Sequence, residues 1–111
     1  MSLVAHDYTP QYRNPIAARA GDRVQVGRAD PEFPGWRWCQ GPDGRQGWVP
    51  EEWLRQHGAK AAMRRDYTAQ ELAVRAGTEV SLGEAIHGWV WATDTDGHAG
   101  WIPLTCLAPA R

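Results

Sequence analysis

The most distinctive side chains of this sequence are its tryptophans, of which there are seven in 111 residues. An indole ring offers a flat apolar face that stacks on proline rings or guanidinium groups, and an N–H that donates one hydrogen bond. Trp36, Trp38 and Trp48 each recur 53 positions later, as Trp89, Trp91 and Trp101. These residue types indicate non-covalent recognition rather than bond-breaking chemistry.

The recurring tryptophans belong to a duplicated segment. GWRWCQGPDGRQGWVPEEWL, at residues 35–54, corresponds to GWVWATDTDGHAGWIPLTCL, at residues 88–107. Tryptophan, Asp-Gly, Gly-Trp and proline positions all match at one offset, which is typical of an internal repeat. The sequence predicts two domains, one at residues 1–56 and one at residues 57–111, joined by the short segment RQHGAKA at residues 55–61.

Each copy has the pattern of a β-hairpin that ends at a proline. Tryptophans alternate with other residues as on a half-buried strand, and Asp-Gly then supplies the positive φ of a tight turn. Pro50 and Pro103 end the second strands because proline cannot donate a ladder hydrogen bond. Strands are expected at residues 3–7, 22–27, 36–38, 46–49, 78–83, 89–91 and 99–102. Their expected core residues are Val24, Val26, Val49, Val80, Leu82 and Ile102.

Composition restricts the function. The formal net charge of −1 argues against a nucleic-acid partner held by bulk charge. No apolar run approaches the roughly 20 residues that cross a bilayer, and the N-terminus has no signal pattern, so we expect a cytoplasmic protein without a membrane partner. Cys39 and Cys106 lack metal-ligand spacing, as do the histidines, so we expect reduced thiols, no metal and no cofactor. No nucleophile and base occur in a catalytic pattern, and the protein is expected not to be an enzyme.

The order of motifs resembles the Src homology 3 (SH3) domain, twice. VAHDY at residues 4–8 and MRRDY at residues 63–67 stand in place of the family's ALYDY segment. ELAVRAG at residues 71–77 is similar to ELxFxxGD, and the GWxW and GWVP or GWIP pieces are similar to WWxA and GYIPSNYV. The resemblance implies an all-β protein of two tandem SH3-like five-stranded barrels. It also implies a single 3₁₀ turn near residues 51–53 and near residues 104–106.

The resemblance further implies a peptide groove on each repeat, with aromatic walls. In repeat one the wall positions fall on His6, Tyr8, Trp36, Pro50 and Trp53. In repeat two they fall on Arg65, Tyr67, Trp89, Pro103 and Cys106, so two walls are lost there.

Two further positions complete the implied grooves. Trp48 and Trp101 match a residue beside the family's specificity pocket, although a half-buried strand aromatic is the simpler account. The acidic residue that anchors a ligand arginine matches Glu71 in repeat two, whereas repeat one has Pro15 there. Trp38 and Trp91 either extend a binding surface or seal the contact between the two barrels.

The sequence therefore favours a non-catalytic adaptor module that docks a proline-containing or extended peptide of a partner protein, mainly on repeat one. One alternative is a structural or regulatory subunit whose aromatic surface is buried in a repeat or homodimer interface. Another is an aromatic-cage or nucleic-acid reader. The exposure of Trp36 and Trp53 separates the first reading from the structural one.

Overall fold

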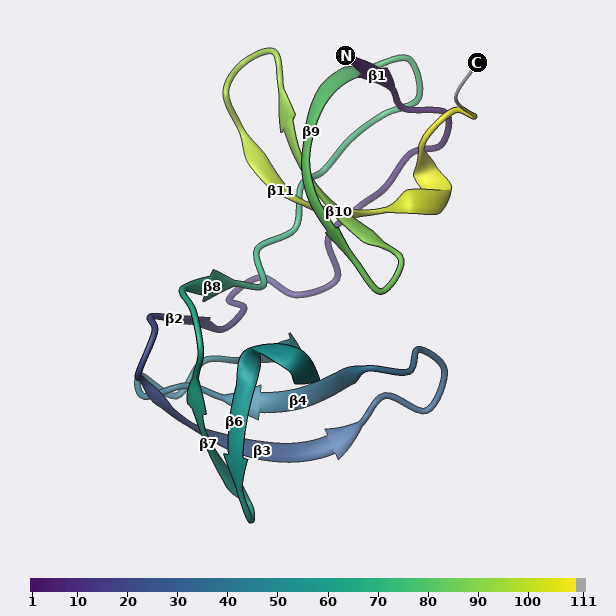
Figure 1. Cartoon of the computed structure of the whole chain (residues 1–111). Helices are drawn as coiled ribbons and strands as arrows, with labels where there is room; N and C mark the ends of the chain where they lie inside the picture. The colour runs from purple at the N-terminus through teal and green to yellow at the C-terminus, as the bar shows by residue number, and fades with distance from the viewer. Residues whose placement is uncertain (110–111) are drawn as a thin grey trace. The chain divides into compact units, whose positions relative to one another are not determined.

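The computed structural model describes residues 1–109, which are built of β-strands and two 3₁₀ turns (Figure 1). The predicted all-β class is confirmed. The strands are β1 (Ser2–Leu3), β2 (Ala17–Ala18), β3 (Arg23–Ala29), β4 (Trp36–Gln40), β5 (Gln46–Pro50), β6 (Leu54–His57), β7 (Lys60–Met63), β8 (Tyr67–Thr68), β9 (Glu79–Ile86), β10 (Trp89–Asp94) and β11 (Ala99–Pro103). The turns are η1 (Glu51–Trp53) and η2 (Leu104–Cys106), at the two places where they were predicted.

The chain divides into two compact units. Unit 1 contains Met1–Gln11 and the segment from Glu71 onward, and unit 2 contains Tyr12–Gln70. The predicted division was at residue 56, between the two sequence repeats. The compact units instead divide after Gln11 and after Gln70, so each of them combines parts of both repeats.

The sheets are open. Unit 1 has one sheet in the order β1-β9-β10-β11, and unit 2 has one in the order β5-β4-β3-β7-β6 together with the pair β2-β8. The predicted closed five-stranded barrels are therefore corrected to open sheets. In unit 1 the segment after β1 meets the chain after β11 only at the single bridge of Val4 with Leu107, and one bridge is too short to form the ladder that would close the sheet.

The tryptophan hairpins form as the sequence predicts. In β4 and β5, Trp38 lies opposite Trp48, and in β10 and β11, Trp91 lies opposite Trp101. The two Asp-Gly turns place their glycines at φ +88°. This left-handed conformation is one that glycine adopts without steric cost.

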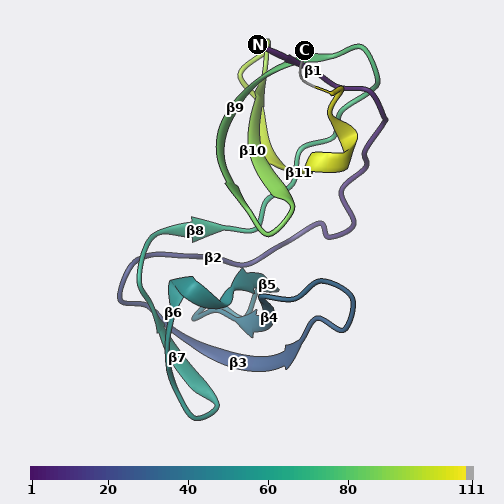
Figure 2. The same ribbon diagram turned by 45° about the vertical axis from the view of Figure 1, so that its right-hand side comes forward.

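The first strand of each sequence repeat lies in the unit that holds the body of the other repeat. β1 pairs with β9, and Val4 bridges to Leu107, so the start of repeat one completes unit 1. β7 pairs with both β3 and β6, so the start of repeat two completes unit 2. Figure 2 shows β7 beside β3 and β6, and β1 beside β9.

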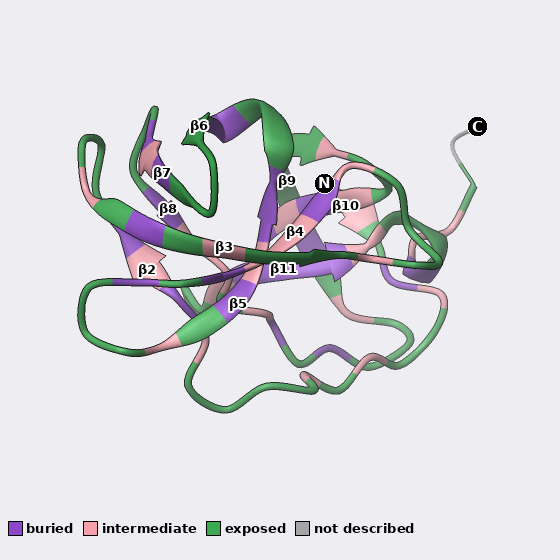
Figure 3. Ribbon diagram, turned by 90° about the horizontal axis from the view of Figure 1, so that it is seen from below, coloured by how far each residue is buried: buried purple, intermediate pink, exposed green. Residues whose placement is uncertain are grey.

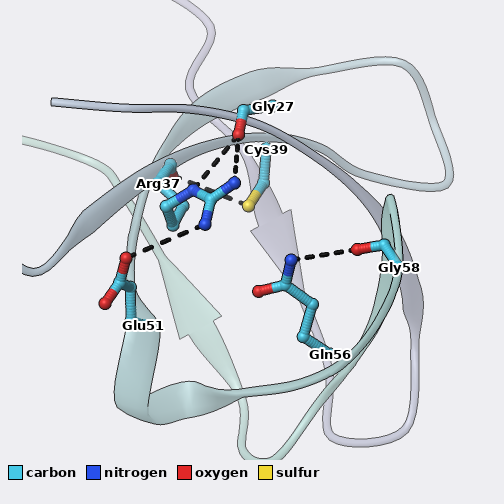
Figure 4. Close-up of polar contacts among 6 residues, drawn as sticks. All are labelled: Gly27, Arg37, Cys39, Glu51, Gln56 and Gly58. Carbon is cyan, nitrogen blue, oxygen red and sulfur yellow. Dashed lines mark hydrogen bonds and ion pairs between the residues drawn. The ribbon is translucent and has the colours of Figure 1, made fainter.

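This strand exchange follows from the segment expected to be a linker. Residues 55–61 instead belong to a hairpin, in which His57 pairs with Lys60 around the two-residue turn Gly58-Ala59. Gly58 has φ +63°, and the Gln56 side-chain amide donates to its carbonyl at 2.9 Å (Figure 4). A two-residue turn holds β7 directly against β6, and closing it costs far less entropy than closing the roughly 50-residue loop that would bring β1 there.

Matching hydrogen bonds hold the exchanged segments in the two units. In unit 1 the Asp7 carboxylate accepts from the Ala76 backbone N–H at 2.7 Å. In unit 2 the Asp66 carboxylate accepts from the Ala20 backbone N–H at 2.9 Å. Because Asp7 and Asp66 are the equivalent aspartates of VAHDY and MRRDY, the same joint is made twice, each time with the other repeat.

Each unit has its own apolar core. The core of unit 1 comprises Val4, Leu72, Val74, Val80, Val90, Ala92 and Ile102. Buried apolar residues of unit 2 include Ile16, Val24, Cys39, Val49, Leu54, Ala61 and Met63. On β3 the buried Val24 is flanked by exposed neighbours, as the alternating colours of that strand show (Figure 3).

Two expected core residues depart from the prediction. Leu82 is 42 % exposed and Val26 only half-buried. Leu82 lies on β9 where the register with β10 shifts between Val90 and Ala92. Leu82 still pairs with Ala92 and keeps the alternation set by Val80, but a β-bulge bends the strand directly after it, so we attribute the exposure of Leu82 to this bend. Within residues 1–109 no helix is long and apolar enough to span a membrane.

Candidate functional site

Strand exchange regroups the residues that the sequence singled out. His6, Tyr8, Glu71, Trp89, Trp101 and Pro103 lie in unit 1, and Trp36, Trp48, Pro50, Trp53 and Tyr67 lie in unit 2. The set expected on repeat one is therefore divided between the two units. Tyr8, which the sequence grouped with Trp36, instead joins Glu71 and Trp89, the anchor and the platform of repeat two.

In unit 1 an aromatic wall and a carboxylate meet. The Tyr8 ring meets Trp89 edge to face, with centroids 5.7 Å apart and planes at 80°. The Tyr8 hydroxyl donates a hydrogen bond to Glu71 Oε1. Pro103 lies opposite Trp89 in the β10–β11 pair. All four residues are half-buried, so each keeps part of its surface in contact with solvent.

Backbone contacts fix this arrangement. Tyr8 exchanges two backbone hydrogen bonds with Val74, at 2.8 and 3.0 Å, and the Leu72 N–H donates to the Trp101 carbonyl at 3.1 Å. The chain at Glu71 runs so close to Gly100 that a Cβ there would lie 2.5 Å from the Glu71 carbonyl carbon. Gly100 is thus the residue that allows Glu71 to approach β11.

The electrostatics of unit 1 are acidic. Burial raises the pKa of Glu71, while hydrogen bonds from the Tyr8 hydroxyl and the Gln11 backbone act in the opposite direction. Unit 1 contains six Asp and Glu residues against two Arg, a formal charge of −4. A cationic group is therefore attracted both by Glu71 and by the field of the whole unit.

The corresponding surface of unit 2 is filled by its own side chains. Trp36 is 6 % exposed and Trp53 is 9 % exposed. The Arg65 guanidinium lies 4.1 Å from the centre of the Trp53 ring, and the Tyr67 ring meets Trp53 at 5.3 Å. The Tyr67 hydroxyl donates to the Trp48 carbonyl at 2.8 Å. This burial favours the structural reading for the aromatic residues of repeat one.

Other predicted positions have simpler surroundings. His6 is exposed, and its backbone N–H donates to the Cys106 carbonyl at 3.2 Å. Cys106 is buried. Pro15, at the anchor position of repeat one, bridges to Gln46 and precedes the fully buried Ile16.

The paired tryptophans of each hairpin stack within their own unit. Trp38 and Trp48 meet edge to face at 5.0 Å, and Trp91 and Trp101 meet edge to face at 5.4 Å. Arg28 and Tyr12 contact the first pair, although neither of them is predicted as a site residue from the sequence. One feature of the sequence could have pointed to Arg28. At the offset of 56 residues it aligns with Glu84, so the two repeats carry opposite charges next to equivalent tryptophan pairs.

Arg37 serves the structure of unit 2. Its guanidinium donates to the Gly27 carbonyl at 2.6 and 3.1 Å and lies 3.9 Å from the Glu51 carboxylate (Figure 4). These contacts tie β4 to β3 and to η1.

The turn after β10 brings three polar side chains together. Asp94, Asp96 and His98 offer atoms within 4.8 Å of one another. One Asp94 carboxylate oxygen accepts from the backbone N–H groups of Asp96 and His98, both at 2.9 Å. This is the side-chain pattern by which aspartate stabilises a turn, so turn formation accounts for the cluster.

The two cysteine thiols are free and buried. Burial raises the pKa of the Cys39 thiol to about 11, so it stays protonated at neutral pH.

We expect an aromatic disulfide reagent at pH 8 to label Cys39 only after denaturation. A reaction rate in the folded protein close to that of a free thiol would contradict this burial.

The fold and the site together define a class of protein. Each unit contains a tryptophan hairpin that ends in a 3₁₀ turn, and unit 1 presents an aromatic and acidic surface. A family model described as variant SH3 domain matches residues 3–56 and 64–110. The chain belongs to the SH3 domain family, with two copies in tandem, and domains of this family are generally protein-interaction modules. Neither a curated protein nor a solved structure matches the chain.

Proposed function

We propose that this protein is a non-catalytic adaptor in which unit 1 binds an extended, proline-containing peptide that carries a basic residue. The observation that carries the proposal is the meeting of Tyr8, Trp89 and Pro103 with the Glu71 carboxylate on one half-exposed surface. The sequence alone predicts that the peptide binds mainly to repeat one. The burial of Trp36 and Trp53 moves the proposal to unit 1.

The chemistry of unit 1 suits such a ligand. A polyproline II peptide is already extended, so it loses little conformational entropy when its proline rings pack on flat aromatic faces. A ligand guanidinium beside Trp89 would pair with Glu71 by charge-assisted hydrogen bonds and stack on the indole. The acidic charge of unit 1 adds a longer-range attraction for the same ligand.

We infer a structural role for the equivalent surface of unit 2. The Arg65 cation already lies over Trp53, and Trp36, the equivalent of Trp89, is buried. A second basic peptide would therefore meet like charge and an occupied aromatic face. The two free, buried thiols suit a reducing compartment, and we place the adaptor in the cytoplasm.

Peptide binding can be measured by titration of a proline-rich peptide with one arginine into the 15N-labelled protein. Trp89→Ala is expected to weaken binding at least thirtyfold, as loss of a central aromatic contact worth about 2 kcal/mol or more does. Glu71→Gln is expected to weaken it about tenfold through loss of the charge-assisted pair. Glu79→Gln, an exposed change of equal charge in unit 1, is the matched control and should have less than a twofold effect. Equal losses in the two Gln variants, or shifts confined to the indoles of unit 2, would refute the site.

The pH dependence of binding should report Glu71. As the pH falls through the raised pKa of Glu71, its carboxylate loses charge and affinity for the arginine peptide should decrease. The stability of unit 1 should change in the opposite direction. A carboxyl whose pKa is higher in the folded than in the unfolded state stabilises the fold below its ordinary value, and this stabilisation is lost as the pH rises through the raised one. The Glu71→Gln chain should lack both transitions; an unchanged pH profile in that chain would assign them to another group.

A further inference from the structure

An aromatic cluster with one arginine, outside the unit 1 site, lies on β3, β4 and β5 of unit 2 and on the loop that precedes β2. Its members are Tyr12, Arg28, Trp38 and Trp48. The Tyr12 and Trp38 rings are 5.4 Å apart, and the Arg28 guanidinium carbon lies 5.2 Å from the Trp38 ring centre and 5.3 Å from that of Trp48. Tyr12 and Arg28 are exposed, and the two tryptophans are half-buried.

Arg28 is a cation without an acidic partner. Among residues 1–109 its guanidinium contacts the two indoles and forms no ion pair with a carboxylate. Stacking on the rings leaves its in-plane N–H groups available, and these suit a planar carboxylate. Nearby polar groups are already engaged: Trp38 Nε1 donates to Gln46 at 2.7 Å, and Asp30 accepts from the backbone N–H groups of its own loop.

Charge separates the two units. Unit 2 contains ten Lys and Arg residues against seven Asp and Glu, a formal charge of +3, where unit 1 has −4. The duplication kept the stacked tryptophan pair in both units and placed Glu84 in unit 1 where unit 2 has Arg28. The same aromatic frame is thus combined with opposite charges.

We propose that the Tyr12, Arg28, Trp38 and Trp48 surface is a second binding site, which takes an acidic peptide segment through an Asp or Glu carboxylate paired with Arg28. An apolar or proline residue next to that carboxylate would pack on Trp38 and Tyr12. A single available guanidinium matches one carboxylate, whereas a doubly charged phosphate is usually met by several cationic groups. Arg37, the sequence neighbour of Trp38, is engaged with Gly27 and Glu51 and so does not supply a second one. The protein would then join a basic and an acidic segment, one on each unit.

The test uses a synthetic peptide of Glu-Pro repeats, titrated into the 15N-labelled full chain with the indole N–H signals as readout. It should shift the signals of Trp38 and Trp48 and leave those of Trp89 and Trp91 in place. Arg28→Gln is expected to weaken binding about tenfold or more while the other indole signals stay at their folded positions. Arg23→Gln, an exposed change of equal charge on the same strand, is the matched control and should have less than a twofold effect. Glu84→Arg should give Trp91 a response to the same peptide.

Three results would overturn the proposal. Equal losses of peptide affinity in Arg28→Gln and Arg23→Gln would show that the effect comes from the net charge of unit 2 and not from Arg28 itself. No shift of Trp38 and Trp48 at millimolar peptide would remove the site. A phosphoserine-Pro peptide that binds at least tenfold more tightly would replace the carboxylate with a phosphate as the ligand. None of these outcomes depends on the arginine peptide of unit 1, so the two proposed sites stand or fall separately.

Discussion

A Val4→Asp chain is expected to unfold unit 1 and leave unit 2 folded, although Val4 belongs to the first repeat in the sequence. Val4 is 1 % exposed and packs with Val80, Val90 and Ile102 of the second repeat. An unpaired carboxylate in that core should cost more than about 3 kcal/mol, a large part of the stability of a unit this small. The indole N–H signals of Trp89, Trp91 and Trp101 should collapse to unfolded positions, while those of Trp36, Trp38, Trp48 and Trp53 stay dispersed.

Met63→Asp is the matched experiment in unit 2. Met63 is the equivalent of Val4 in MRRDY, is 3 % exposed, and pairs with Leu54 of the first repeat. Its substitution should collapse the four indole signals of unit 2 and spare the three of unit 1. If Val4→Asp instead collapsed the signals of unit 2, each repeat would fold with its own first strand, and strand exchange would be refuted.

Gly100→Ala is expected to disrupt both the stability of unit 1 and its binding of the arginine peptide. The new Cβ would lie 2.5 Å from the Glu71 carbonyl carbon and 2.6 Å from the Leu72 nitrogen, and both are backbone atoms of one segment. Backbone atoms cannot relieve a clash by a change of rotamer, as a side chain can, so the segment that positions Glu71 must shift. We expect a loss near the upper end of the about 1–3 kcal/mol typical of overpacking, with peptide affinity reduced at least tenfold.

Gly47→Ala provides the control for this prediction because Gly47 is the equivalent glycine of unit 2. Its new Cβ would lie 2.9 Å from the Ile16 Cγ2 methyl, 3.2 Å from the Ala69 Cβ and 3.3 Å from the Ile16 backbone nitrogen, so the overlap is smaller than the one at Gly100. The expected cost is about 1 kcal/mol, without an effect on the arginine peptide. Urea unfolding followed through the indole signals of each unit measures both costs. Equal costs for the two glycines, or normal peptide binding by Gly100→Ala, would contradict the account of Glu71 given by the structure.

Because of strand exchange, the proposed peptide site combines residues of both sequence repeats. The surface proposed to bind the basic peptide takes Tyr8 from one repeat and Glu71, Trp89 and Pro103 from the other. Neither sequence repeat by itself contains that set. Repeat one lacks the acidic anchor, and the equivalent tyrosine of repeat two, Tyr67, lies in unit 2, so we expect the site to require both repeats in the chain.

The local elements of this protein follow from its sequence. The tryptophan hairpins, the Asp-Gly turns, the strand ends at Pro50 and Pro103 and the two 3₁₀ turns each depend on residues within about ten positions of one another. Their conformational preferences act locally, so they can be recognised without knowing the tertiary fold. The family was recognisable for the same reason, because its motifs are short and lie at regular spacing in both repeats.

The tertiary structure alone decided which strand completes which unit. VAHDY and MRRDY are near equivalents, so these two segments do not themselves choose between the two acceptor sheets. The choice comes from the tight turn at Gly58, which keeps β7 beside β6 and leaves β1 for unit 1. The burial of Trp36 and Trp53 and the position of Arg28 over two indoles were likewise decided by packing between residues distant in sequence. Side-chain accessibility depends on which segments cover a residue, and that is settled only when the exchanged strands are in place.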